Sequence, residues 1–249
     1  MASCELQAVF RSLRLYQGVE APKAAMDELY RPFVRPGALV FDVGAHVGDR
    51  VSSFRRLGAR VIAFEPQPLL YRTLRLIHGR DRDVILVAEA AAAETGRMTM
   101  RVNSANPTVS TLSNAFVDDA RGKEGWLEQS WDRAITVPVV TLDQVIARHG
   151  EPAFLKIDVE GFEDTVLNGL NSAVAALSFE FTTISRHVAL NCMDRLAVLG
   201  DYHFNIAMGE TQNLSFTTWL SSDAMASHLI NLPHAANSGD VYARRQSFA

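Results

Sequence analysis

Residues 39–49 read Leu-Val-Phe-Asp-Val-Gly-Ala-His-Val-Gly-Asp, and this stretch decides the fold. Its apolar run through Val43 is typical of a strand that is buried on both faces, as in a parallel sheet. Gly44 and Gly48 bracket a tight loop, in which glycine tolerates positive φ and lets a ligand approach the backbone. A helix is expected to follow, and its first N–H groups and its dipole suit an anionic group.

The spacing of this loop narrows the class of ligand. The pattern is GxxxG, which differs from the GxGxxG of dinucleotide enzymes, and no Lys-Ser/Thr pair follows for a triphosphate. The loop therefore favours a ligand with a carboxylate and an adenosine over one with a pyrophosphate. For His46, inside the loop, we expect a backbone role, with the side chain lining the pocket. The candidate ligand-binding residues of the loop are Asp42, Gly44, Ala45, His46 and Gly48.

A second apolar run, at 60–64, ends at Glu65-Pro66. An acid at the end of the second strand, roughly 20 residues after a glycine loop, is placed to accept hydrogen bonds from two ribose hydroxyls. Pro66 fixes φ and ends the strand, which directs the carboxylate. A single acid would fit a surface glutamate before a turn equally well. The coupled spacing from Asp42 through Gly48 to Glu65 favours a nucleoside site.

Composition bounds the class of protein. The chain has 249 residues, of which 48% are hydrophobic and 21% charged, as is usual for a globular protein with one large α/β domain. The net charge of −4 provides no basic field for nucleic acid. Cys4 and Cys192 fit no metal or redox spacing, which favours inert thiols in a reducing compartment. With no secretion signal and no apolar stretch of membrane-spanning length, we expect a cytoplasmic protein without a membrane partner.

Alternation of strand and helix patterns predicts a Rossmann-like α/β fold, a doubly wound and mostly parallel seven-stranded sheet with one antiparallel strand. The expected strands are 38–43, 60–64, 84–88, 153–158, 176–181, 202–207 and 240–244. The expected helices are 48–57, 67–78, 142–149 (with Thr141 as N-cap), 163–170 and 186–199. Period-two segments at 97–102 and 135–140 predict a small antiparallel extension.

Helical spacing at 3–17 and 22–31 predicts an N-terminal cap, so we divide the chain into a cap at 1–32 and one domain at 33–249. Two long excursions, 103–134 and 209–234, interrupt the alternation. Segments this long between strands are often functional, and we expect both to face the substrate. A disordered insertion at 103–134 fits the sequence equally well. The aromatic residues of the excursions suit either an apolar or ring-shaped ligand or a satellite core.

A second candidate site begins at Lys156, where the sequence reads Lys-Ile-Asp-Val-Glu-Gly-Phe-Glu. Side chains alternate along a strand, so Lys156 and Asp158 share a face, and Asp158 lies where the strand ends. Glu160 just beyond it and Glu180 late in the next strand should reach the same rim, where open α/β sheets bind ligands. The alternative is an ion pair that closes the strand. His187 follows Glu180 closely and is a further catalytic candidate, although a lone histidine is more often structural.

Six segments together resemble the FkbM-type methyltransferases, which use S-adenosylmethionine. They are VFDVGAHVGD at 40–49, AFEPQP at 63–68, VTLDQVI at 140–146, LKIDVEGFEDTVLNGL at 155–170, SFEF at 178–181 and GDVYAR at 239–244. The resemblance implies the class I methyltransferase fold and S-adenosylhomocysteine as product. It implies that the loop from Asp42 to Gly48 holds the methionine part and that Asp158 lies near the sulfonium. It further implies that Glu65, with Pro66 and Gln67, holds the ribose, and that Glu89 and Ala90 lie against the adenine.

The family typically methylates hydroxyl oxygens, often on sugars or natural products, so the expected partner is a small hydroxylated acceptor. An alcohol must lose its proton, and we assign Asp158 as base or acceptor anchor, supported by Glu160 and Glu180, with His187 as a candidate. An aspartate with a pKa of about 3.9 is a weak base, so burial beside Glu160 is expected to raise it.

Several alternatives stay open from the sequence. Mg²⁺ held by the three carboxylates is less favoured, because the sequence shows no tight metal spacing, and no metal ligand is assigned. N-methylation and a non-catalytic S-adenosylmethionine-binding module are also compatible with the chain. The missing GxGxxG argues against a nicotinamide oxidoreductase. A homodimer is compatible with the sequence.

Overall fold

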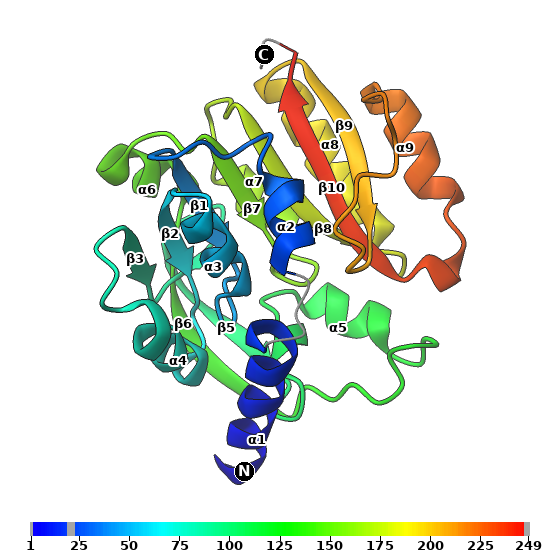
Figure 1. Cartoon of the computed structure of the whole chain (residues 1–249). Helices are drawn as coiled ribbons and strands as arrows, with labels where there is room; N and C mark the ends of the chain where they lie inside the picture. Colours follow the sequence, from blue (N-terminus) through cyan, green and yellow to red (C-terminus); the bar gives the residue numbers. More distant parts are fainter. Residues whose placement is uncertain (1, 19–22, 247–249) are drawn as a thin grey trace.

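A computed structural model describes residues 2–18 and 23–246, and the expected helix at 22–31 starts one residue outside that range. A seven-stranded sheet forms the centre, with the order β3-β2-β1-β7-β8-β10-β9 (Figure 1). Only β10 runs antiparallel to its neighbours β8 and β9, as predicted. The strands are β1 Leu39–Val43, β2 Arg60–Phe64, β3 Val84–Val87, β7 Phe154–Ile157, β8 Ala176–Thr182, β9 Tyr202–Met208 and β10 Ser238–Arg245.

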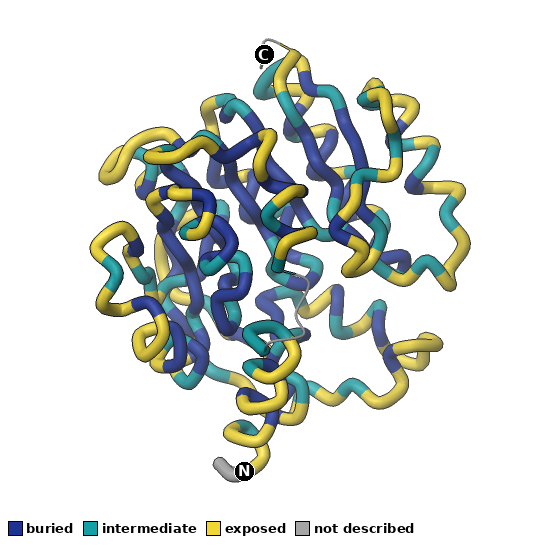
Figure 2. Tube along the Cα trace, viewed as in Figure 1, coloured by how far each residue is buried: buried dark blue, intermediate teal, exposed yellow. Residues whose placement is uncertain are grey.

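Helices cover both faces of this sheet because its strands are apolar on both sides. In β1, Val40 packs into the core between the sheet and helices α2 and α3. Phe41 packs on the opposite face, into the core between the sheet and helices α6, α7 and α8. Figure 1 shows α2 and α3 in front of the sheet and α7 and α8 behind it, and Figure 2 shows the strands buried between these layers. The helices are α2 Lys23–Tyr30, α3 Asp49–Arg56, α4 Pro68–His78, α6 Leu142–His149, α7 Glu163–Asn168 and α8 Arg186–Leu199.

The small second sheet confirms the predicted hairpin and adds a strand. β5 (Gly96–Val102) and β6 (Arg133–Val140) pair antiparallel, as the period-two pattern predicted. The additional strand β4 (Ala90–Ala91) pairs parallel with β6, so the extension is mixed and not purely antiparallel. Two alanines carry no periodic signal, and the sequence could not reveal this strand.

The excursions are folded segments. The first contains a 3₁₀ turn at Pro107–Val109 and the helix α5 (Asn114–Ala120), which is buried through Phe116 and contacts Trp126. The second contains the helix α9 (Ser222–Asn231), which the sequence analysis missed, although Ser221 caps it by accepting a hydrogen bond from the Ala224 N–H.

The N-terminal segment continues from α1 (Ala2–Ser12) into a π-helix at Leu13–Gln17, in place of one regular helix. Val9 of α1 packs with Val47 and Leu70, so this segment lies against the glycine loop and α4. Within the described part of the chain, no helix has both the length and the apolar character needed to cross a membrane.

Candidate active site

Two adjoining cavities lie at the edge of the large sheet where β1, β2, β7 and β8 end. The first has about 530 Å³ of empty space and the second about 940 Å³, and both volumes include space that is open to solvent. This edge, beside the reversal of strand order between β1 and β7, is where open α/β sheets bind ligands. The two cavities share one wall, formed by Gly44, His46, Thr108, Asp158 and Glu160.

The glycine loop brings β1 close to the segment that follows β7. Gly44 has a φ of +92°, and a Cβ there would overlap the carbonyl oxygen of Asp158, so only glycine permits this approach. His46 also has a positive φ, of +49°, and its ring packs edge-on against Tyr16 of the N-terminal segment. Burial lowers the pKa of His46 to about 4, so its imidazole is neutral at physiological pH.

Glu65, directly after β2, is held in one orientation beside the first cavity. It is 2% exposed, its Oε2 accepts the His46 N–H at 3.0 Å, and its Oε1 accepts the Gln67 N–H at 2.8 Å. Burial, partly offset by these two hydrogen bonds, raises the pKa of Glu65 to about 8. Each oxygen keeps a second lone pair, so the carboxyl can accept two further hydrogen bonds from a ligand. Pro66 and Gln67 line the same cavity.

The rest of the first cavity is largely apolar. Its walls come from the carboxyl ends of β1 and β2, from the second sheet and from the loop after β7. These side chains offer apolar contacts for a planar ligand ring but few polar partners. They are Val43, Phe64, Ala90, Ala91, Met100, Leu112, Val159 and Phe162.

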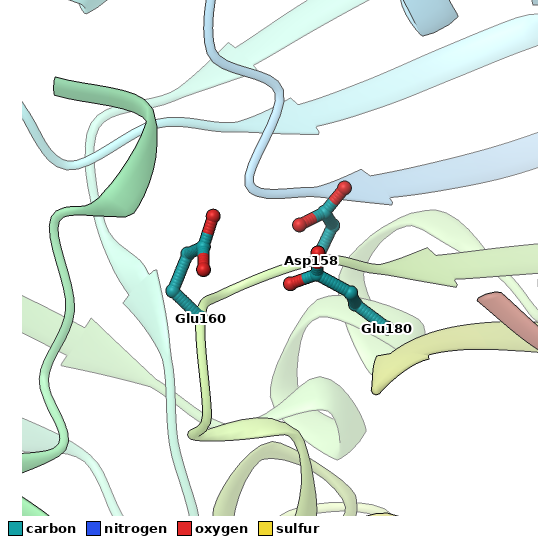
Figure 3. Close-up of side chains that lie close together, drawn as sticks. All are labelled: Asp158, Glu160 and Glu180. Atoms are coloured by element: carbon teal, nitrogen blue, oxygen red, sulfur yellow. The ribbon is translucent and has the colours of Figure 1, made fainter. Parts of the chain in front are cut away.

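Three carboxylates meet at the wall that joins the cavities (Figure 3). Asp158 follows β7, Glu160 lies two residues beyond, and Glu180 belongs to β8; one oxygen of each lies within 4.8 Å of the other two. Glu160 has a φ of +59° and precedes Gly161 at +79°, so the chain turns sharply here. Oε1 of Glu163 accepts the Val159 and Gly161 N–H groups at 2.9 and 3.3 Å, which fixes this turn.

Lys156 sets the charge of this wall. It is 1% exposed, and its Nζ donates to Oδ2 of Asp158 and Oδ1 of Asp240, both at 3.0 Å. Burial alone would raise the pKa of Asp158, but the charge of Lys156, with a smaller contribution from Arg50, holds that pKa below its ordinary value. The expectation of a raised pKa at Asp158 is therefore wrong. Burial first, and neighbouring carboxylates second, raise the pKa of Glu160 and Glu180 well above the usual range.

A family model described as "Methyltransferase FkbM domain" matches residues 42–199, which is more than half of the chain and includes the wall that the two cavities share. The chain belongs to the FkbM methyltransferase family. The loop at 42–48, Glu65 and the 156–163 block, on which the resemblance rested, all lie within the matched range.

One curated FkbM relative and one solved structure extend this result. The 31-O-demethyl-FK506 methyltransferase FkbM of Streptomyces tacrolimicus is 32% identical over 166 residues, which cover 56% of this chain and 62% of the relative. The chain thus matches about three fifths of that relative's length. A TehB-like SAM-dependent methyltransferase from Corynebacterium glutamicum covers 98% of this chain and 99% of its own, with a TM-score of 0.51 and 11% identity. That likeness shows the class I methyltransferase fold.

The family implies S-adenosylmethionine, and the residues present fit it. The apolar first cavity suits an adenine, and Glu65 offers two free lone pairs for a ribose diol. Asp42 is 1% exposed and lines the second cavity, where its Oδ2 has no hydrogen-bond partner in the described structure. An orphaned buried carboxylate oxygen of this kind suits the ammonium of an amino acid. Burial raises the pKa of Asp42 to about 7.

Three predicted site residues of this FkbM chain lie elsewhere. Gly48 lines neither cavity and packs against Leu74 and His78. His187 is exposed on the first turn of α8 and lines neither cavity, so the structure does not bring it together with the other site residues. The reason is that α8 begins beyond the rim and turns this side chain to solvent. Glu89 is half-buried and lies outside both cavity walls, because it precedes the strand whose alanines, Ala90 and Ala91, form the wall.

Sequence reasoning missed most residues on the acceptor side. Tyr16, Arg50, Glu210 and Asn237 line the second cavity together with Trp126. They come from segments far apart in the chain, and no local pattern marks them. For Trp126 a signal existed, since aromatic residues in the excursions suggested a ring contact. The remaining excursion aromatics are packed elsewhere: Trp131 donates to the Val109 carbonyl and Trp219 lies under Arg244.

Proposed function

We propose that this chain is an S-adenosylmethionine-dependent methyltransferase that methylates a hydroxyl oxygen of a small molecule. The observation that carries the proposal is the wall shared by the two cavities. One side of this wall fits an adenosine at Glu65, and the other side is a polar cavity with room for the amino acid part of the cofactor at Asp42 and for a second molecule. Asp158 and Glu160 border both sides and therefore lie where two bound molecules would meet.

When bound, S-adenosylmethionine supplies an electrophilic methyl group for in-line displacement, and the protein's task is alignment and proton removal. Glu65 and the apolar walls would fix the nucleoside, and Asp42 the amino group. Asp158 stays ionised beside Lys156 and can accept a hydrogen bond from the acceptor hydroxyl. The pKa values of Glu160 and Glu180 are raised, so the ionised form of either group is a stronger base than an ordinary carboxylate.

Two further observations support an oxygen-bearing acceptor. The indole N–H of Trp126 is buried against the second cavity and has no hydrogen-bond partner in the described structure, so it can donate to a ligand oxygen. The relative from Streptomyces tacrolimicus carries a name that specifies an O-demethylated substrate.

Calorimetric titration with S-adenosylmethionine and S-adenosylhomocysteine tests the cofactor, and transfer of a labelled methyl group tests the acceptor. We would offer pairs of sugars and polyketides that differ only by hydroxyl or amine at one position. Transfer to the hydroxyl member supports the proposal. Transfer to the amine member alone would replace it with N-methylation, and binding without any transfer would indicate an interaction module. If neither cofactor form binds, the proposal is refuted.

A further inference from the structure

The second cavity contains more acidic than basic side chains. Six carboxylates line it, against one arginine and one lysine: Asp42, Asp49, Asp158, Glu160, Glu180 and Glu210, with Arg50 and Lys156. Both positive groups are already engaged, since Arg50 pairs with Asp49 and Glu210, and Lys156 with Asp158 and Asp240. Across residues 2–18 and 23–246, Glu160 and Glu180 form no ion pair.

The side chains of Glu160 and Glu180 are also unsatisfied. Glu160 is 6% exposed, and its carboxylate takes part in no hydrogen bond of the described structure. Oε2 of Glu180 is fully enclosed and likewise has no partner among the described atoms. Buried polar groups are nearly always satisfied, and a buried carboxylate without a partner is costly. Oxygens of the three carboxylates lie within 4.8 Å of one another (Figure 3), so one ion between them would supply the missing partner.

We propose that Asp158, Glu160 and Glu180 bind one divalent metal ion of the oxygen-preferring class, Mg²⁺, Mn²⁺ or Ca²⁺. Their oxygens lie within 4.8 Å of one another. Of three oxygens around one ion at least two pairs are adjacent, about 3.3–3.7 Å apart around Ca²⁺ and about 2.8–3.0 Å apart around Mg²⁺, so oxygens within 4.8 Å of one another need at most a small contraction around either ion. Water in the second cavity can complete the coordination shell, as Mg²⁺ in particular requires.

The backbone holds the three ligands ready for an ion. Oε1 of Glu163 accepts two N–H groups of the turn, and the Thr111 hydroxyl donates to the Glu160 carbonyl at 2.7 Å. Lys156 engages Oδ2 of Asp158 and leaves its other oxygen free. Such supporting contacts orient ligands and tune metal affinity. The cavity that contains the acceptor would then contain the ion, which would lower the pKa of a nearby hydroxyl.

This inference rests on the proposed function and specifies its acceptor side. The ion, and not the carboxylates alone, would lower the pKa of the acceptor hydroxyl. The nucleoside residues Glu65 and Gln67 do not take part. Cofactor binding and ion binding are therefore separable measurements, and either can fail without the other. A positive charge from the cofactor or from an amine acceptor is the competing explanation for the acidic wall. Metal titrations with and without S-adenosylhomocysteine distinguish this explanation from a metal site.

The experiment is calorimetric titration of the whole chain with MnCl₂ and CaCl₂, with and without saturating S-adenosylhomocysteine, which carries no sulfonium charge. Terbium(III) emission gives a second readout, because Trp126 lines the same cavity and can sensitise an ion bound there. The variants are Glu180→Gln and Glu160→Gln. Glu151→Gln is the matched control, since Glu151 is exposed and precedes β7 at the opposite edge of the sheet.

We expect one ion per chain, with affinity that falls about tenfold or more in each cluster variant and is unchanged in the control. Thermal melting and S-adenosylhomocysteine binding report whether a variant is folded. Absence of saturable binding to the wild type overturns the proposal, and so does binding that Glu180→Gln and Glu160→Gln leave unaltered. Ion binding without S-adenosylhomocysteine binding would keep the metal site and reject the methyltransferase, whereas the reverse result would reject the metal site alone.

Discussion

Replacing Glu65 with glutamine is the sharpest test of the nucleoside site. The two backbone N–H groups of His46 and Gln67 each bond one carboxylate oxygen, at 3.0 and 2.8 Å, so the carboxylate cannot rotate freely. A glutamine of the same shape offers one oxygen and one NH₂ group. Its NH₂ group would face an N–H donor, so the variant loses one internal hydrogen bond and one acceptor for the ribose.

The expected loss of affinity follows from these contacts. A hydrogen bond to a charged group is worth about 1.5–3 kcal/mol, so at about pH 9, above the Glu65 pKa of about 8, two such bonds to a ribose diol would contribute about 3–6 kcal/mol. Glutamine keeps one neutral acceptor, so about 3 kcal/mol is lost, which corresponds to a dissociation constant about 100-fold higher. Calorimetric titration with S-adenosylhomocysteine measures this directly. The control is Glu89→Gln, one residue before the wall formed by Ala90, and we expect no change beyond about twofold.

Two results would refute this reasoning. The first is a folded Glu65→Gln protein, with a wild-type melting profile, that binds S-adenosylhomocysteine almost as tightly as the wild type. The second is a large loss in Glu89→Gln, which would show that the adenosine lies further along the second sheet than the cavity predicts. A loss in both variants would indicate general destabilisation of the β2–β3 edge and not a ribose contact.

Three further predictions concern stability, each measured by urea denaturation. Gly44→Ala should lower the unfolding free energy by about 2 kcal/mol or more because of its φ of +92° and its overlap with Asp158, whereas Gly96→Ala, with open space around it, should not. For Asp42, a folded pKa of about 7 means that between about pH 4 and pH 7 only the native state keeps this carboxyl protonated. The free energy of unfolding therefore falls as the pH rises across that interval. The wild type should therefore lose about 3 kcal/mol more than Asp42→Asn between pH 5 and 8, and equal slopes would exclude the shift. Lys156→Met should lower the free energy of unfolding by about 3 kcal/mol because it leaves the partly buried carboxylates of Asp158 and Asp240 unpaired. A urea midpoint equal to that of the wild type would contradict the ion pairs.

The elements that could be predicted from sequence are those whose signal is local. β2 has the bounds that its apolar run predicted, and α6 and α8 also begin and end as expected. Thr141 caps α6 by accepting the Gln144 N–H, so a single side chain marked that start. Local signals failed where packing alone decides the structure. α9 is only weakly amphipathic, and it forms because Met225 and Leu229 are buried against the main core.

The site residues also divide into those that the sequence predicts and those that only tertiary contacts place. Convergence of Asp158, Glu160 and Glu180 followed from one rule, that neighbouring parallel strands end at one edge. The structure confirms that they converge. The acceptor side could not be predicted, because Tyr16 and Glu210 reach the second cavity only through the positions of the π-helix and the loop after β9. Such loop positions depend on tertiary contacts that carry no sequence period.

The charge of the active site depends on strand order more than on any motif. Asp240 lies 84 residues from Lys156, yet β10 inserts beside β8 and pairs Asp240 with Glu180 in register. Lys156 therefore pairs with Asp240 as well as with Asp158, and it forms no ion pair with Glu160 or Glu180. Had β10 lain outside β9, Lys156 would have had one carboxylate fewer to balance. The antiparallel strand thus leaves the acceptor wall with more carboxyl groups than cations, and a bound cation would allow Glu160 and Glu180 to ionise there.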